Sequence, residues 1–140
     1  IDRFTNGGIR GIAVIPGQDV VFVAMRHYGI WKVNLTPAGA YDLANPMTRI
    51  LDFNGDPNSA LLGGTIDAMD YDPYANKLVF GMDSANARGL WEVNLDGTGA
   101  NRLVEGVFVR GIDFLPQIPT PGSALILGLG GLLAARRRRV

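Results

Sequence analysis

The chain contains no cysteine and a single histidine, His27, so disulfide bonds and thiolate metal sites are excluded. Its basic residues form no cluster before position 136. Residues 1–135 carry nine basic and thirteen acidic side chains, which leaves this part of the chain with a net charge of −4. Nucleic-acid binding needs a clustered basic face, so we expect no nucleic-acid partner.

What the chain does contain is an internal repeat. Residues 8–39 align with residues 65–99, an alignment that pairs Met25 with Met82 and the run GIWKVNL with GLWEVNL. The second copy is three residues longer just after its methionine, where DSANAR replaces RHY. Such a length difference belongs in an exposed hairpin loop. A third copy begins at residues 109–116, where VRGIDFLP is similar to IRGIAVIP, and then stops.

Each full copy has the pattern of four short strands. Runs of apolar, β-branched and aromatic residues alternate with turns rich in Gly, Pro, Asn and Asp. Four antiparallel strands per repeat unit are typical of β-propeller blades. The sequence therefore predicts an all-β protein with two four-stranded blades plus one strand, which is an incomplete ring. The expected strands are 11–15, 20–25, 30–35 and 48–53, then 66–72, 77–82, 90–95 and 101–106.

The second copy resembles the propeller blades of the YWTD type and of the NHL group. The residues that fit those blades are Asp72, Pro73, Leu78, Asp96 and Gly97, while residues 79–82 occupy the YWTD position without its Tyr, Trp or Thr. The resemblance implies that residues 1–116 form part of a propeller. Propellers have about 4 to 8 blades, so further blades are expected upstream. Because the chain starts at Ile1 and shows no signal peptide, we expect it to be the C-terminal piece of a longer protein.

The C-terminal end has a different composition. Residues 123–135 form an apolar run, followed by a basic tail at 136–140 that contains Arg136, Arg137, Arg138 and Arg139. With the low-polarity residues before it, the run is just long enough for a membrane-spanning helix, which needs about 20 residues and at least about 17. The positive-inside rule would keep the arginines cytoplasmic and place the propeller outside the membrane. A buried core helix and an ordinary tail anchor or stop-transfer segment are the alternatives.

The segment before this run carries prolines. Residues 117–122 include Pro119, Thr120, Pro121 and Gly122, and the two prolines favour an extended, accessible peptide. The order of proline motif, apolar segment and arginine cluster resembles the PEP-CTERM sorting signal of bacteria, with Thr120 where that family usually has Glu. The resemblance implies sorting, and possible cleavage, by exosortase, a membrane protease.

Candidate catalytic and metal-binding residues are few. His27 lies in the hairpin RHYG, where a solvated loop histidine is expected. Asp67, Asp70 and Asp72 carry the oxygen ligands that calcium prefers, but on a strand Asp67 points to the opposite face from the other two. We expect a structural role instead, with Asp72 bonding backbone groups at the DPYAN turn. The sequence thus nominates no catalytic residue, no metal site and no cofactor.

Trp31 and Trp91 occupy equivalent positions in the two copies. Aromatic residues at fixed repeat positions usually fill the core between blades, and carbohydrate stacking is the alternative. The leading functional hypothesis is an exported, non-catalytic surface or exopolysaccharide-associated propeller, held at the bacterial membrane. The alternatives are a propeller enzyme such as a lactonase-like hydrolase and a receptor-like binding module.

Overall fold

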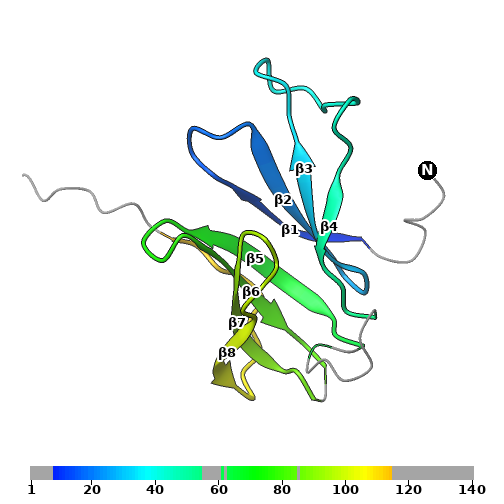
Figure 1. The fold of residues 1–140 in the computed structure, drawn as a ribbon. Coiled ribbons are helices and arrows are strands. Elements are labelled where there is room, and N and C mark those ends of the chain that lie inside the picture. Colours follow the sequence, from blue (N-terminus) through cyan, green and yellow to red (C-terminus); the bar gives the residue numbers. More distant parts are fainter. Residues whose placement is uncertain (1–7, 55–60, 62, 85, 115–140) are drawn as a thin grey trace, which may run out of the picture.

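In a computed structural model, the chain folds into two four-stranded antiparallel sheets (Figure 1). The structure describes residues 8–54, 61, 63–84 and 86–114. In each sheet every strand pairs with the next along the chain. Within the described residues there is no helix. The all-β prediction is confirmed. The first sheet contains β1 (Ile9–Val14), β2 (Val20–Met25), β3 (Gly29–Asn34) and β4 (Thr48–Leu51), and the second contains β5 (Ile66–Asp72), β6 (Lys77–Met82), β7 (Gly89–Asn94) and β8 (Asn101–Glu105).

Turn chemistry sets the ends of these strands as the sequence predicts. Between β5 and β6, the carboxylate Oδ1 of Asp72 accepts hydrogen bonds from the backbone N–H groups of Tyr74 (2.8 Å) and Ala75 (3.1 Å). Asn76 completes this turn in the left-handed region, with φ of 54°. Asparagine tolerates that conformation better than most residues, which is why the DPYAN sequence turns here. The expected role of Asp72 in this turn is confirmed.

The two sheets repeat each other in detail. Both have a register shift at the start of the first strand pair and another between the third and fourth strands. Gly29 and Gly89 open the third strands with φ of 113° and 149°. A Cβ atom at either position would collide with a backbone carbonyl of the fourth strand, that of Leu51 or Val104. Only glycine fits such a site without strain, so the repeat extends to the backbone geometry.

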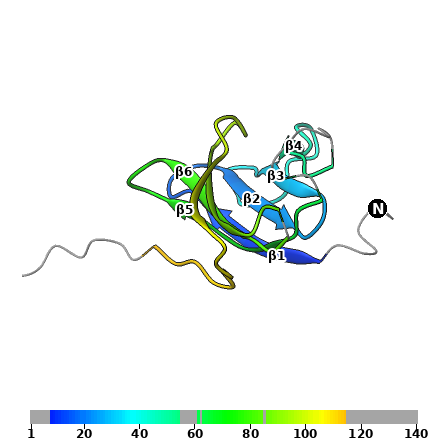
Figure 2. The ribbon, with the colours of Figure 1, turned by 90° about the horizontal axis from the view of Figure 1, so that it is seen from below.

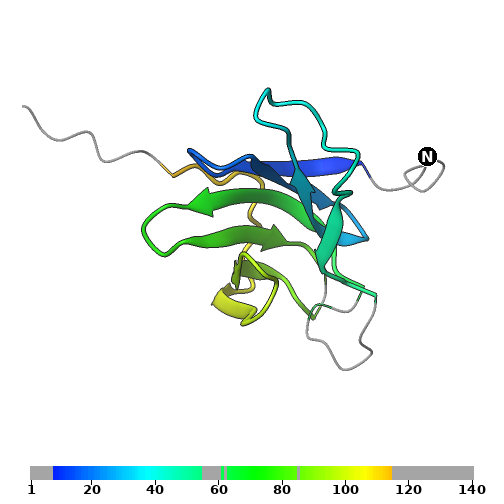
Figure 3. The ribbon, with the colours of Figure 1, turned by 45° about the horizontal axis from the view of Figure 1, so that its top comes forward.

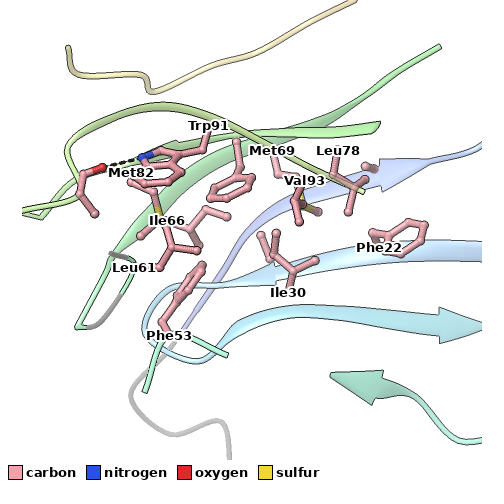
Figure 4. Close-up of a cluster of buried hydrophobic side chains, with 14 of the residues drawn as sticks. Phe22, Ile30, Phe53, Leu61, Ile66, Met69, Leu78, Met82, Trp91 and Val93 are labelled. Carbon is pink, nitrogen blue, oxygen red and sulfur yellow. Dashed lines mark hydrogen bonds between the residues drawn. The ribbon is translucent and has the colours of Figure 1, made fainter. Parts of the chain in front are cut away.

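The sheets lie face to face, with β1 alongside β5 (Figures 2 and 3). The backbones approach closely at Gly11, where a Cβ would lie 2.7 Å from the backbone nitrogen of Met69. Side chains alternate between the two faces of a strand, so each sheet contributes one face to the interface. Figure 4 shows the core that results, which includes Phe22, Ile30 and Phe53 from the first half and Ile66, Met69, Leu78, Trp91 and Val93 from the second. Phe80 is buried in the same cluster.

The start of the third copy is not a strand, which corrects the prediction of one further strand. Residues 107–114 have no regular structure. In the two complete copies the first strand pairs with the second strand of the same copy, and no second strand follows among the described residues. The segment still lies against the second sheet. The backbone N–H of Phe114 donates to Asp70 Oδ2 (3.2 Å), and Val109 contacts Gly81.

The proline motif, the apolar run 123–135 and the arginines 136–139 lie outside the described residues. A search of the described ranges finds no helix long and apolar enough to cross a membrane.

Candidate functional site

The first sheet has one covered and one uncovered face. Its covered face packs Phe22 and Ile30 against the second sheet. On the opposite face the first strand leaves Ile9 58% exposed and Ile12 55% exposed. The equivalent residues of the second sheet, Ile66 and Met69, are 0% and 5% exposed because the first sheet covers them. The uncovered face of the first sheet is thus the counterpart of a buried face in the second.

This uncovered face contains a pocket of about 420 Å³. Its volume falls in the range of about 300–1,000 Å³ that is usual for ligand sites. The lining is almost wholly apolar and comes from the start of β1, from β2 and β3, and from the loop between β3 and β4. The lining residues are Gly8, Ile9, Val23, Met25, Trp31, Val33, Tyr41 and Met47.

Trp31 is the largest side chain in the pocket, and its surroundings differ from those of Trp91. The indole Nε1 of Trp91 donates a 2.7 Å hydrogen bond to the carbonyl oxygen of Ala87 (Figure 4). The indole Nε1 of Trp31 is buried and has no hydrogen-bond partner among the residues that the structure describes. Ala87 belongs to the hairpin that is three residues longer in the second copy. The shorter hairpin of the first copy places no equivalent carbonyl beside Trp31, which leaves its donor unsatisfied.

Each tryptophan has an arginine from the neighbouring strand over its ring. The guanidinium of Arg49 lies 5.5 Å from the ring centroid of Trp31, and that of Arg102 lies 4.9 Å from the ring centroid of Trp91. Each arginine also forms an ion pair with the acidic residue three positions later in the chain: Arg49 with Asp52, and Arg102 with Glu105. These contacts repeat between the copies, so they belong to the scaffold. The pocket at Trp31 therefore has a charged edge beside its apolar lining.

The β3–β4 loop supplies one wall of the pocket. Tyr41 and Met47 come from this loop, where the backbone N–H of Met47 donates to Tyr41 Oη (3.3 Å). Asp42 folds the loop by accepting hydrogen bonds from the side chain of Asn45 (2.7 Å) and the backbone N–H of Ala44 (2.9 Å). These hydrogen bonds lower the pKa of Asp42 below its ordinary value. The bond from the Asn45 side chain has the largest effect, followed by the bond from the Ala44 backbone. The carboxylate thus stabilises the loop at neutral pH.

His27 lies in the hairpin between β2 and β3 and is exposed, as the sequence predicts. Its Nδ1 is 3.4 Å from Thr65 Oγ1, and its backbone carbonyl accepts a hydrogen bond from Asn54 Nδ2 (2.8 Å). These contacts connect the hairpin to the segments on either side of the linker between the sheets. They support a structural role for the loop that carries His27.

Two of the three aspartates of β5, Asp70 and Asp72, accept hydrogen bonds from backbone N–H groups. Asp70 accepts from the N–H of Tyr71 (2.8 Å) as well as from Phe114, and Asp72 caps the following turn. Asp67 lies at the register shift between Ile66 and Ala68. Among the described residues no group of three acidic or histidine side chains is arranged to hold a metal ion.

The sequence points to Trp31 but does not predict the pocket around it. Two signals were available in the alignment of the copies. The hairpin of the first copy lacks three residues, and Val23 stands where the second copy has the larger Phe80. Both differences remove atoms from the same side of the first sheet. The other site residues that the sequence predicts, Pro119 to Gly122 and Arg136 to Arg139, lie outside the described residues.

Comparison of the chain with protein-family models, curated proteins and solved structures gave no match.

Proposed function

We propose that the chain forms two blades of a β-propeller in an exported, non-catalytic protein of the bacterial surface or its exopolysaccharide. The order of segments at the C-terminus carries the export part of this proposal. A proline motif at 119–122, an apolar run at 123–135 and four arginines at 136–139 follow one another without interruption. The arginines would stay on the cytoplasmic side, and the sheets would lie outside the membrane.

The stacking of the sheets supports the blade assignment. The two sheets share register shifts, glycine positions and tryptophan–arginine pairs. The face that carries the tryptophan points the same way in both sheets. The first sheet covers the Trp91 face of the second, and its own Trp31 face is uncovered. Units that repeat with one direction of stacking continue into a ring when more units are added, as in a propeller.

The partner for sorting is an exosortase-like membrane protease. A proline-rich peptide next to the membrane is a suitable substrate, because proline disfavours the interior of a helix and of a strand ladder. Residues already paired in sheets are protected from such an enzyme. Cleavage near Pro119, Thr120, Pro121 and Gly122 would release the acidic domain from its anchor or transfer it to another carrier.

Mass spectrometry of the mature protein tests the sorting step. The chain is expressed behind a functional signal peptide in a bacterium that has an exosortase, and the mature form is expected to lack residues 125–140. The double variant Pro119→Ala, Pro121→Ala is expected to keep its full length. A matched double variant at Pro16 and Pro73, in the turns of the two sheets, is expected to be processed normally. If the mature native protein keeps its arginine tail, the sorting proposal is wrong and the C-terminal segment is a permanent membrane anchor.

Protease added to spheroplasts tests the orientation separately. The sheets are expected to be degraded or released from the outside before lysis. Protection of the sheets until the cells are lysed would place them in the cytoplasm and overturn the export proposal.

The pocket at Trp31 favours a receptor-like binding module as the second candidate. It is a preformed apolar site of about 420 Å³, and sites of this size and lining commonly bind ligands.

A further inference from the structure

We infer that the two sheets meet the membrane surface with one particular edge, the edge at which the first strand of each sheet ends. This edge, called the exit edge below, consists of the turns 15–19, 35–47, 73–76 and 95–100. In each sheet these turns connect the first strand to the second and the third strand to the fourth. The partner is the surface of a lipid bilayer. The inference rests on the proposed function, because it takes residues 123–135 as the membrane segment.

The last described residues lead to the exit edge. Residues 107–114 cross the outer face of the second sheet from one edge to the other. Val109 lies against Gly81, near the end of β6, and the backbone N–H of Phe114 donates to Asp70, near the end of β5 (3.2 Å). Because β5 and β6 are antiparallel, their ends lie at opposite edges of the sheet. Phe114 is therefore at the exit edge, and Figure 1 shows the orange segment ending on the same side as the turn between β5 and β6.

The chain that joins Phe114 to the apolar run is short, since only residues 115–122 lie between them. Fully extended, the path from Phe114 to Ser123 is at most about 30 Å, and a flexible chain of this length spans on average about 15–18 Å. A strand as long as β5, which has seven residues, places the opposite edge about 20 Å farther away. To bring the opposite edge to the membrane, the connecting segment would have to run back along the whole strand. The short connection therefore favours the exit edge.

The side chains of the exit edge suit a lipid surface. Its four turns contain no lysine or arginine, whereas the hairpins of the opposite edge contain Arg26 and Arg88. Two large side chains of the exit edge are strongly exposed, Leu43 by 85% and Tyr74 by 59%. Leucine gains from entering an apolar layer, and tyrosine is enriched at membrane interfaces, where its ring lies among the headgroups.

The turns that carry Leu43 and Tyr74 are each held in place by an aspartate. Asp42 accepts hydrogen bonds from the backbone N–H groups of the two residues after Leu43, and Asp72 accepts those of Tyr74 and the residue after it. Because the turns are formed beforehand, little conformational entropy is lost when they meet the headgroups. The acidic side chains of the four turns are Asp19, Asp42 and Asp96. They predict a preference for zwitterionic over anionic lipids.

Fluorescence quenching by labelled lipids tests this orientation. The chain has no cysteine, so a single cysteine can carry a fluorophore at a chosen position. Ala44→Cys and Ala75→Cys place the label on the exit edge, and His27→Cys and Asn86→Cys place it at exposed positions of the opposite edge. The full 140-residue chain is added to preformed phosphatidylcholine vesicles that contain a lipid with a nitroxide on its headgroup. We expect the labels at 44 and 75 to be quenched several-fold more strongly than those at 27 and 86.

A double variant tests the two exposed side chains. In Leu43→Glu, Tyr74→Glu the labels at 44 and 75 are expected to lose most of their excess quenching, while the chain still floats with the vesicles through residues 123–135. Leu103→Glu is the matched control, because it places the same charge on another exposed leucine, within β8 and outside the four turns. Its quenching is expected to match that of the native chain. Circular dichroism verifies that both variants keep their sheets.

The outcomes distinguish a failure of this inference from a failure of the proposed function. A chain that does not float with the vesicles has no membrane anchor, which overturns the anchor and the inference together. A chain that floats but shows equal quenching at all four positions, or stronger quenching at 27 and 86, overturns the inference alone. Unchanged quenching in the double variant would also overturn it, because the edge would then be near the membrane without contact through Leu43 and Tyr74.

Discussion

Replacing Trp91 with alanine is expected to destabilise the protein far more than the same change at Trp31, although the two residues occupy equivalent positions. Trp91 is 4% exposed, lies in the core between the sheets and donates a hydrogen bond to Ala87. A fully buried tryptophan replaced by alanine typically costs about 3–5 kcal/mol, through lost burial and the cavity that remains. The carbonyl that loses its donor adds to this cost.

At Trp31 the same substitution removes less. The side chain is half-buried on an uncovered face, so solvent fills the space that it leaves and no closed cavity forms. Within the described part of the chain its indole makes no hydrogen bond that could be lost. Both variants lose an arginine contact of similar geometry, worth about 0.5–1 kcal/mol, which cancels in the comparison. We expect a cost of about 1–2 kcal/mol for Trp31→Ala, on the basis of partial apolar burial.

The assay is urea unfolding of both variants followed by far-ultraviolet circular dichroism, since the substitutions change the fluorescent residues themselves. The expected difference in the free energy of unfolding is about 2–3 kcal/mol, which follows from the two costs above. Equal destabilisation would refute the argument, because it would mean that the Trp31 face is buried in solution. Repeating the measurement at several protein concentrations then shows whether a second copy buries it.

The remaining predictions concern turns and loops. Gly29→Ala is expected to cost about 3 kcal/mol in unfolding free energy because of its positive φ and the opposing carbonyl, whereas Gly17→Ala, with a positive φ but open space, should cost about 1 kcal/mol. Asp72→Ala removes the acceptor of two backbone N–H groups and should lower stability by about 1–2 kcal/mol in the same urea assay. Asn45→Ala is expected to raise the pKa of Asp42 toward its ordinary value in an NMR titration. Because the folded pKa of Asp42 is lowered, its contribution to stability is present above its unfolded pKa and lost as the pH falls through the folded pKa, and the variant should show a smaller loss. A titration midpoint that stays unchanged in the variant would contradict the assigned cause.

The strands could be predicted from the sequence because each is bounded by residues with a strong local preference. The DPYAN turn and the glycines that open the third strands fix where the chain reverses, and apolar runs between such turns leave little alternative to a strand. The prediction was wrong for residues 109–114, although their sequence VRGIDF is similar to the IRGIAV of β1. A strand also needs a partner strand to pair with, and the composition of a segment does not show whether such a partner is present.

The pocket could not be predicted in the same way, because it depends on which face of each sheet is covered. Trp31 and Trp91 lie in nearly identical local sequences, and composition assigns both to a core. The stacking order of the sheets decides that only Trp91 is covered. What the alignment of the copies does contain is the difference in hairpin length and the exchange of Phe80 for Val23, and these differences mark the position of the pocket.

The two outer faces of the stack differ in polarity, and this difference limits what can bind to them. The outer face of the second sheet carries Asp70 and the ion pair between Lys77 and Glu92 (2.6 Å), at positions where the first sheet has Ala13, Val20 and Lys32. Residues 107–114 also lie against this face. Placing it on the apolar Trp31 face of a second copy would bury charged groups against a surface that offers them few partners, which is costly. Head-to-tail stacking of two copies through these faces is therefore disfavoured.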